Sequence, residues 1–359
     1  MSESSTVVRG RFHHRRRDGR VQCDLCPRHC RMKDGQKGFC FVREARDGAV
    51  YLTSYGRASG FCIDPIEKKP LNHFQPGTAV LSFGTAGCNL GCRFCQNWDI
   101  SKAREHDRLT DTARPQDIVR AAKGAGCRSI AFTYNDPVIF AEYAIDTAVA
   151  AREAGIGSVA VSAGYITDKA RPAFFEHLDA VNIDLKAFSE EFYGSLCFAQ
   201  LEPVLDTLRY VRHQTNTWLE ITTLLIPDHN DSEAEVATLC EWIVEQLGPD
   251  VPLHFSAYHP DYRLNAPPTP RRTLQRARAQ ALSAGLRHVY TGNIHDQEGQ
   301  STYCSGCGRR VITRDGYHVL AYELTPDGCC SACDQPMVGR FGAQAGNWGP
   351  RRRRLAIAP

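Results

Sequence analysis

The chain has 359 residues, of which 42% are hydrophobic and 23% are charged, with 43 Lys and Arg against 40 Asp and Glu. This composition excludes a collagen-like, coiled-coil or wholly disordered protein. A formal net charge of +3 is too small to indicate nucleic-acid binding, and no apolar run approaches the ~20 residues of a membrane helix. The first residues lack the apolar core of a signal peptide, so we expect a cytoplasmic protein with no membrane partner.

Both ends of the chain are rich in arginine. Residues 1–20 contain almost no apolar side chains and are predicted to form a disordered basic tail. Residues 341–359, which carry the run Arg351–Arg354, are interpreted as a second basic tail. We expect both charge runs to be solvated rather than bound to nucleic acid.

The chain has 16 cysteines, which in a cytoplasmic protein indicates metal binding or catalysis rather than disulfide bonding. The first group lies within 18 residues and consists of Cys23, Cys26, Cys30 and Cys40. It predicts a metal-binding module with its linker over residues 21–75. Thiolates at this spacing suit either zinc or an auxiliary iron–sulfur cluster, so the sequence leaves the metal open.

Short apolar runs alternate with helical patterns between residues 76 and 298. Strands are predicted over residues 79–83, 129–133, 158–161, 180–183, 219–226, 253–257 and 288–291. Helices are predicted over residues 116–124, 138–153, 169–177, 202–212, 232–246 and 271–283. This alternation indicates parallel βαβ units, and therefore an α/β fold. With six or seven units, a full or partial β/α barrel is favoured over an open sheet.

Polar residues follow five of these strands directly, at positions 133–136, 162–164, 184–186, 258–259 and 291–293. The carboxyl ends of parallel strands form the active mouth of β/α folds. We therefore expect these five clusters to meet at one rim.

The segment 87–95 follows the first predicted strand and carries Cys88, Cys92 and Cys95 at C-x3-C-x2-C spacing. Three thiolates on one compact loop can hold three irons of a 4Fe–4S cluster and leave the fourth iron open. Such an iron can bind the amino and carboxylate groups of S-adenosylmethionine, and one electron then releases a 5′-deoxyadenosyl radical. Taken alone, the spacing also suits a zinc site or chance.

A third cysteine group lies near the C-terminus. Two C-x2-C pairs separated by 22 residues predict a closed zinc-ribbon-like module over residues 299–340, with the ligands Cys304, Cys307, Cys330 and Cys333. A rubredoxin-like iron site is the alternative. Cys329 adjoins Cys330, but Cys330 is favoured because it keeps the pair spacing.

The triplet and its β/α context resemble those of radical S-adenosylmethionine enzymes. The run Asp64-Pro65-Ile66-Glu67-Lys68-Lys69-Pro70-Leu71 and the segment 87–101 are similar to the radical enzyme of the AmmeMemoRadiSam system. That group is similar in turn to pyruvate formate-lyase activating enzymes. The resemblance covers about residues 21–335 and implies a partial, six-stranded β/α barrel.

The resemblance also implies which residues contact the cofactors. Cys88, Cys92 and Cys95 match the ligands of the 4Fe–4S cluster, and Phe94 matches an aromatic position whose backbone approaches the adenine. Asn135 or Asp136 stands where related enzymes hold the methionyl amine.

Further cofactor contacts follow the later strands. The motif Asp184-Leu185-Lys186 matches one in which the lysine meets the cofactor carboxylate as a point charge. Ser162 stands where the activating enzymes often have an acidic group for the ribose, so that contact is altered or lost. His259 stands where they have a histidine near the ribose.

The leading hypothesis is reductive cleavage of S-adenosylmethionine, followed by hydrogen abstraction from a substrate. A small or system-specific substrate is ranked above a glycine of a partner protein, the substrate of an activase. The resemblance implies Memo-like and AMMECR-like partners, and the chemistry needs an electron donor such as flavodoxin or ferredoxin.

Two other classes of function compete with a radical enzyme. A metal-stabilised scaffold that binds nucleic acid or protein would need a fourth ligand, and no further cysteine stands close to Cys95. A hydrolytic barrel with ligands such as Asp136, Asp184 and His259 would have no use for oxygen-sensitive thiolates.

Overall fold

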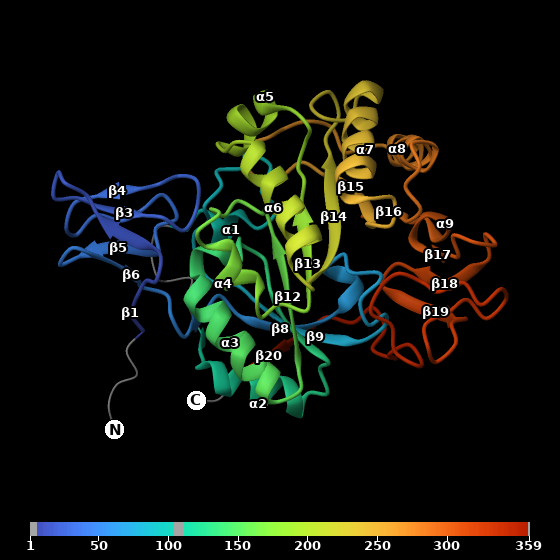
Figure 1. Ribbon diagram of the computed structural model, residues 1–359, viewed down its shortest axis with the longest axis horizontal. Coiled ribbons are helices and arrows are strands. Elements are labelled where there is room, and N and C mark those ends of the chain that lie inside the picture. The colour runs from blue at the N-terminus through green and yellow to red at the C-terminus, as the bar shows by residue number, and fades with distance from the viewer. Residues whose placement is uncertain (1–5, 104–108, 110, 358–359) are drawn as a thin grey trace.

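A computed structural model describes residues 6–103, 109 and 111–357 (Figure 1). Its centre is a nine-stranded sheet with the order β16-β15-β14-β13-β12-β11-β9-β8-β20. The strands are β8 (Phe61–Pro65), β9 (Ala79–Phe83), β11 (Ser129–Phe132), β12 (Gly157–Ser162), β13 (Ala180–Asp184), β14 (Trp218–Leu225), β15 (Leu253–Ala257), β16 (Val289–Gly292) and β20 (Arg353–Leu355).

Seven neighbouring strands of this sheet, β9 and β11 to β16, run parallel. Each overlaps one of the predicted strands, and the α/β class with a parallel sheet is confirmed. The described residues thus contain seven parallel strands, one more than the six that the resemblance implies. β8 pairs antiparallel with β9, and β20 pairs antiparallel with β8.

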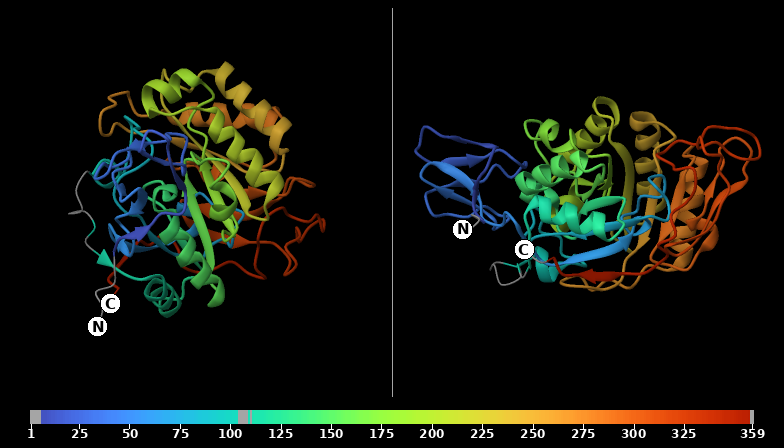
Figure 2. Two further views of the ribbon diagram at one scale, coloured as in Figure 1. Left: turned by 60° about the vertical axis from the view of Figure 1, so that its left-hand side comes forward. Right: turned by 90° about the horizontal axis from the view of Figure 1, so that it is seen from below.

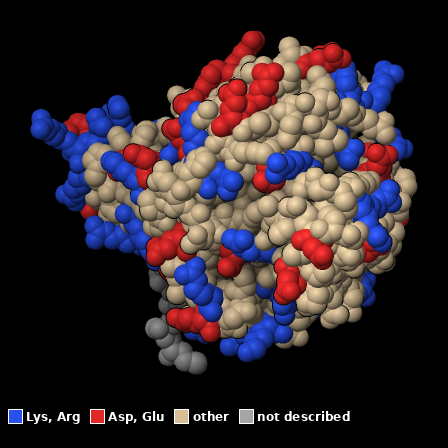
Figure 3. Space-filling model, turned by 45° about the vertical axis from the view of Figure 1, so that its right-hand side comes forward, with Lys and Arg blue, Asp and Glu red and all other residues tan. Residues whose placement is uncertain are grey.

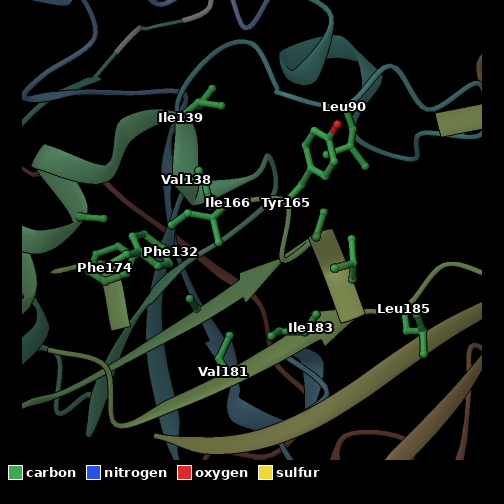
Figure 4. Packing of buried hydrophobic residues seen from close by; sticks show 14 of the residues in the cluster. Leu90, Phe132, Val138, Ile139, Tyr165, Ile166, Phe174, Val181, Ile183 and Leu185 are labelled. Atoms are coloured by element: carbon green, nitrogen blue, oxygen red, sulfur yellow. The ribbon is translucent and has the colours of Figure 1, made fainter. Parts of the chain in front are cut away.

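The helices that connect the parallel strands lie along one face of the sheet (Figure 2). They are α2 (Pro115–Gly124), α3 (Ala141–Glu153), α4 (Arg171–Phe175), α6 (Glu202–Gln214), α7 (Glu233–Leu247) and α8 (Arg271–Ser283). Right-handed crossovers between parallel strands place successive helices on the same side, which explains the layer. Phe132, Phe174 and Ile183 belong to the hydrophobic cluster between sheet and helices, part of which Figure 4 shows.

The opposite face of the sheet is covered by the chain between β8 and β9 and is mixed in character. Strand residues such as Val80 and Val159 pack there against Ile66, Leu71 and Phe74, and polar side chains lie beside this apolar cluster. Glu220 of β14 accepts hydrogen bonds from the backbone N–H groups of Asn72 (3.0 Å) and His73 (2.8 Å). Its carboxylate also lies 2.7 Å from His254 Nε2 of β15. The run 64–71, which carries the family resemblance, begins this filling segment and includes the 3-10 turn η1 (Ile66–Lys68).

An N-terminal lobe stands at one end of the molecule. It consists of two antiparallel three-stranded sheets formed by β1 (Val8–Arg9), β2 (His13–Arg15), β3 (Val21–Cys23), β4 (Arg31–Met32), β5 (Arg43–Arg46) and β6 (Ala49–Leu52).

The prediction of a disordered tail over residues 1–20 is therefore wrong for residues 8–9 and 13–15, which form β1 and β2. The basic side chains there have acidic partners elsewhere, because Arg11 pairs with Asp146 and His14 lies 2.5 Å from Asp24. Residues 1–5 of the predicted tail lie outside the described residues.

The C-terminal module lies at the other end of the molecule (Figure 1). Its sheet is formed by β17 (Thr302–Tyr303), β18 (Arg310–Asp315) and β19 (His318–Tyr322). From there the chain returns along the central sheet. The second basic tail is ordered in part, because Arg353–Leu355 forms β20, whose residues pair with positions 61–63 of β8. The side chains of Arg351–Arg354 are exposed, as expected for a solvated charge run. Residues 358–359 lie outside the described residues.

Short elements complete the fold. They are β7 (Arg57–Ala58), β10 (Asp111–Thr112), α1 (Trp98–Ser101), η3 (Pro137–Phe140), α5 (Glu190–Phe192), the π-helical turn η4 (Tyr193–Cys197) and α9 (Gln297–Gln300). Within the described ranges, every helix is too short or too polar to cross a membrane.

Candidate functional site

The loop that carries Cys88, Cys92 and Cys95 follows β9 at the carboxyl end of the parallel sheet. Two backbone hydrogen bonds hold it against η4, from Gly91 N–H to the carbonyl of Cys197 (2.8 Å) and from Arg93 N–H to that of Leu196 (2.9 Å). Leu90 of this loop lies beside Tyr165, above the ends of the strands (Figure 4). The loop is therefore fixed by contacts far away in the sequence.

Asn135 holds the start of the same loop. Its side-chain oxygen accepts from Thr85 N–H (2.9 Å), and its amide group donates to the Gly87 carbonyl (2.8 Å). Asn135 is only 4% exposed. The amide of Asn135 is thus engaged with the loop. Asp136, by contrast, has a side-chain oxygen without a hydrogen-bond partner among the described residues.

Asp136 caps η3 and lies beside Ser162 of β12. Asp136 Oδ1 accepts hydrogen bonds from Val138 N–H (3.1 Å) and from Ser162 Oγ (3.0 Å). Asp136 Oδ2 is buried and has no hydrogen-bond partner among the described residues. Burial raises the pKa of Asp136 to about 6, because a carboxylate loses its hydration there.

The three loop thiols have different surroundings. Burial raises the pKa of Cys88 to about 12, and Asp136 is the next largest contribution. The pKa of Cys92 is lowered to about 6, first by a hydrogen bond with Cys197 and then by the charges of Lys186 and Lys102. Cys92 is buried, whereas Cys88 and Cys95 are half-buried.

Lys186 joins this group from the end of β13. Its ammonium lies 2.9 Å from Asp184 Oδ2. Burial by itself lowers the pKa of Lys186. The charges of Asp184, Cys92 and Cys197 have a larger combined effect and raise this pKa above its ordinary value. Lys186 is therefore a cation at neutral pH, close to the buried cysteine of the loop.

The structure brings Asp136, Ser162 and Lys186 close to the cysteine loop. Two further residues that the sequence singled out differ from each other in burial. Phe94 is buried, with its ring centroid 5.6 Å from that of Phe192. His259 is exposed, two residues beyond the end of β15.

Two residues at the site were missed. Cys197 is fully buried and hydrogen-bonded to Cys92, yet it lies in an irregular stretch with no motif around it. Lys102 follows α1, donates to the Leu90 carbonyl (3.0 Å) and contributes its charge to all three loop cysteines. Its contribution depends on how the loop folds back, which the sequence pattern does not contain.

The C-terminal cysteines form a compact group. The Sγ atoms of Cys304, Cys307, Cys330 and Cys333 all lie within 4.8 Å of one another, and Cys329 does not belong to the group. The pair Cys304 and Cys333 is separated by 3.6 Å, and the pair Cys307 and Cys330 by 3.8 Å. Among the described residues, this is the one group of three or more potential ligands with such close spacing, so the loop triplet and the N-terminal four are wider.

Several cavities lie among the described residues, and one of about 370 Å³ adjoins the cysteine loop at Cys88 and Lys102. Two larger ones lie beside the sheet. The larger, about 930 Å³, opens at the amino ends of the strands near Gly157, Asp179 and Thr217, away from the cysteine loop. The other, about 620 Å³, is lined by His254 and Ser256 from the polar face of β15 and by Asn293 and Arg314. The register Asp184↔Thr222↔His254 places this second cavity two strands, about 10 Å, from Asp184.

Comparisons with known proteins agree with this arrangement. The family model of the radical SAM superfamily matches residues 83–240, a region that contains the cysteine triplet, Asp136 and Lys186. A protein of Methanocaldococcus jannaschii named uncharacterized protein MJ0808 is 41% identical over 304 residues, covering 84% of this chain and 90% of that protein. GTP 3',8-cyclase of Chlorobaculum tepidum is 26% identical over 155 residues, 42% of this chain and 45% of that enzyme.

A solved structure is similar in fold. The radical SAM methyltransferase from Sphaerobacter thermophilus aligns with a TM-score of 0.50 at 15% identity, over 81% of this chain and 78% of that one. At this identity the likeness concerns the fold alone.

Proposed function

Because the chain belongs to the radical SAM superfamily, we propose that it is an enzyme that cleaves S-adenosylmethionine reductively with a 4Fe–4S cluster held by Cys88, Cys92 and Cys95. When bound, this cluster would supply the electron for cleavage of the sulfonium to methionine and a 5′-deoxyadenosyl radical. That radical would then take hydrogen from the substrate. The observation that carries the proposal is a three-thiol loop placed beside a buried carboxylate oxygen without a partner.

The residues of this chain suit both groups. Three thiols spaced too widely for a single ion fit a polynuclear cluster that leaves one iron open. Asp136 Oδ2 offers an acceptor for an N–H of the methionyl amine, and that N–H would satisfy the orphaned atom. Lys186 offers a positive charge for the carboxylate, while Ser162 orients Asp136 and Asn135 holds the loop.

The substrate in this proposal is a small polar molecule that enters the cavity lined by His254, Ser256, Asn293 and Arg314. The cavity shares a face of the sheet with Asp184, two strands away. This location favours a small or system-specific substrate over a glycine of a partner protein, the substrate of an activase similar to that of pyruvate formate-lyase. Partners similar to the Memo and AMMECR families, as in the AmmeMemoRadiSam system, belong to the same proposal.

The electron donor we propose is a low-potential carrier with an acidic surface, such as flavodoxin or ferredoxin. The N-terminal lobe supports this choice, because residues 6–52 contain twelve Lys and Arg against five Asp and Glu. Many of these basic side chains are exposed on the lobe, at the left in Figure 3. A basic surface next to the cysteine loop accelerates encounter with an acidic partner.

We also propose that the C-terminal cysteines hold a structural zinc ion. With Zn–S bonds of about 2.3 Å, tetrahedral geometry requires S–S distances of about 3.8 Å, and the two pairs lie at 3.6 Å and 3.8 Å. The core of this module is small, with six buried residues, so a metal is needed to stabilise it.

Metal analysis of one variant tests this assignment. Cys92→Ala, reconstituted anaerobically, is expected to lose the iron of the loop and to keep the C-terminal zinc. Equal loss of both metals would mean that Cys92 is needed for folding rather than for a cluster, and would count against the proposal.

A further inference from the structure

The N-terminal lobe contains a second cysteine site that faces the loop of the first. Cys23 lies on β3, Cys26 and Cys30 lie in the turn that follows, and Cys40 precedes β5. A hydrogen bond from Cys23 N–H to the Cys30 carbonyl (3.0 Å) closes this turn. All four cysteines line one enclosed cavity of about 10 Å³, so the fold gathers their side chains around a common centre. These side chains would have to move apart to hold a cluster larger than a single ion.

The spacing of these thiols separates the two metals that the sequence left open. A single zinc ion would draw the four Sγ atoms to about 3.8 Å from one another. The C-terminal four have this spacing, whereas among the described residues the N-terminal four, like the central triplet, do not. In a 4Fe–4S cluster, the type proposed for this site, each of the four thiolates binds a different iron, so the sulfurs surround a larger body than a zinc ion.

Charge around the cavity also favours an anionic cluster. Arg43 lines the cavity, is 1% exposed and pairs with Glu142, with Nη2 2.5 Å from Oε2. Arg28 also lines the cavity and stacks on Phe39, with its guanidinium carbon 3.5 Å from the ring centroid. Because Glu142 neutralises Arg43, the guanidinium of Arg28 is the net positive charge among these groups, and it offsets part of the charge of four thiolates bound to iron.

The N-terminal site is joined directly to the central loop. Arg28 donates from Nε to the Asn89 carbonyl and from Nη2 to the Phe198 carbonyl. The Cys40 carbonyl oxygen lies 2.0 Å from where a Cβ on Gly87 would stand, so only glycine fits there, next to Cys88. Cys40 of the N-terminal site therefore contacts Gly87, the residue that precedes Cys88 of the central loop.

We propose that Cys23, Cys26, Cys30 and Cys40 hold a second 4Fe–4S cluster, packed against the loop of the S-adenosylmethionine cluster. Its existence does not depend on the proposed function, whereas its closeness to a second cluster does. With four cysteines and no open position, this cluster is closed, as in electron carriers.

The test compares metal content in three anaerobically reconstituted and desalted proteins, analysed for iron, acid-labile sulfide and zinc per chain. These are the wild type, the triple variant Cys88→Ala/Cys92→Ala/Cys95→Ala, and the matched control Cys127→Ala, whose buried cysteine belongs to none of the groups. We expect the triple variant to keep about half of the wild-type iron and sulfide, with zinc unchanged, and the control to keep everything. A triple variant with no iron and a second zinc ion would overturn the proposal.

A reciprocal variant guards against misfolding of the first. Cys26→Ser/Cys30→Ser changes two half-buried positions and should remove the other half of the iron. If it keeps all the wild-type iron, the N-terminal cluster does not exist. Equal iron in the wild type and the triple variant would instead contradict the central cluster of the proposed function, and would leave the N-terminal one supported.

The neighbourhood of the two clusters has its own readout. In reduced wild-type protein, electron paramagnetic resonance should show two interacting centres, and each variant should show one isolated centre. Two non-interacting signals in the wild type would contradict the packing of the second cluster against the central loop.

Discussion

Ser162 Oγ donates a hydrogen bond of 3.0 Å to Asp136 Oδ1, and the other oxygen of the same carboxylate is buried without a partner. The serine thus has a different role from the ribose contact considered from the sequence. It orients a carboxylate whose second oxygen is available to a ligand. A buried acceptor of this kind destabilises the empty protein and is satisfied by a bound N–H donor.

Asp136→Asn should separate stability from binding. The pKa of Asp136 is raised from 3.8 to about 6 by burial, which corresponds to roughly 3 kcal/mol against the ionised form at neutral pH. The variant should therefore melt a few degrees higher than wild type without ligand at pH 8, while its affinity for S-adenosylmethionine falls at least tenfold. Thermal unfolding and equilibrium dialysis of the reconstituted protein measure both, with the exposed Asp206→Asn as control.

The sign of the pH dependence follows from the same carboxyl group. The pKa of Asp136 is higher in the folded protein than in the unfolded chain. Without ligand, the protonated carboxyl therefore contributes stability to the folded state that is fully present below pH 3.8 and is lost as the pH rises through about 6. Binding of S-adenosylmethionine has the opposite trend, because an N–H of the methionyl amine donates a stronger hydrogen bond to the ionised carboxylate than to the neutral acid. Affinity for S-adenosylmethionine should rise between pH 5 and 7 in wild type and stay flat in Asp136→Asn. A wild-type affinity independent of pH in that range would refute the contact.

Lys186→Ala should weaken cofactor binding and leave the cluster in place. The lysine provides the positive charge beside Asp184 and Cys92 without serving as a metal ligand. We expect a loss of affinity of about tenfold or more, because a hydrogen bond to a charged group contributes about 1.5–3 kcal/mol. The iron content should equal that of the surface control Lys123→Ala. Loss of iron in Lys186→Ala alone would show that the lysine supports the cluster instead.

Asn135→Ala should act on the loop rather than on the cofactor. Its side chain makes hydrogen bonds to Thr85 and Gly87, which fix the entry to the cysteine loop. The variant should release iron to a chelator several times faster than wild type, whereas its affinity for S-adenosylmethionine per remaining cluster is unchanged. If iron release is normal and affinity falls, the amide contacts the cofactor directly.

How much the sequence predicts depends on the range of the interactions. The seven parallel strands and the helices that connect them follow from local apolar periodicity, which is strong in runs such as 129–133 and 253–257. β1, β2 and β20 have two or three residues each, too few for any periodicity to show. The pairing of Arg11 with Asp146 joins residues that are 135 positions apart in the chain, so no local pattern predicts it.

The site is divided in the same way. Cys88, Cys92 and Cys95 are recognised by spacing within one loop, and the C-terminal group is recognised by two local pairs. Cys197 reaches Cys92 from more than a hundred residues away, through the backbone bonds of Gly91 and Arg93 to η4. No local pattern marks such a residue.

Removal of the C-terminal metal should loosen one module only. Val311 and Ile312 belong to a small cluster that also contains Cys304 and Cys330, so the sulfurs are part of its core. Cys304→Ala should lose one zinc ion and make residues 302–337 accessible to limited proteolysis, while the iron of the central loop remains. If the module without zinc resists the protease, zinc is not needed to stabilise its fold.

The central claim is radical cleavage of S-adenosylmethionine at the Cys88 loop. The most direct measurement is 5′-deoxyadenosine formed anaerobically by the reconstituted protein, with S-adenosylmethionine and a strong reductant, against Cys88→Ala. The account predicts product in the wild type and none above background in the variant. Absence of product from a wild type that never assembles the loop cluster, with zinc as its sole metal, would contradict the account and favour a metal-stabilised binding scaffold.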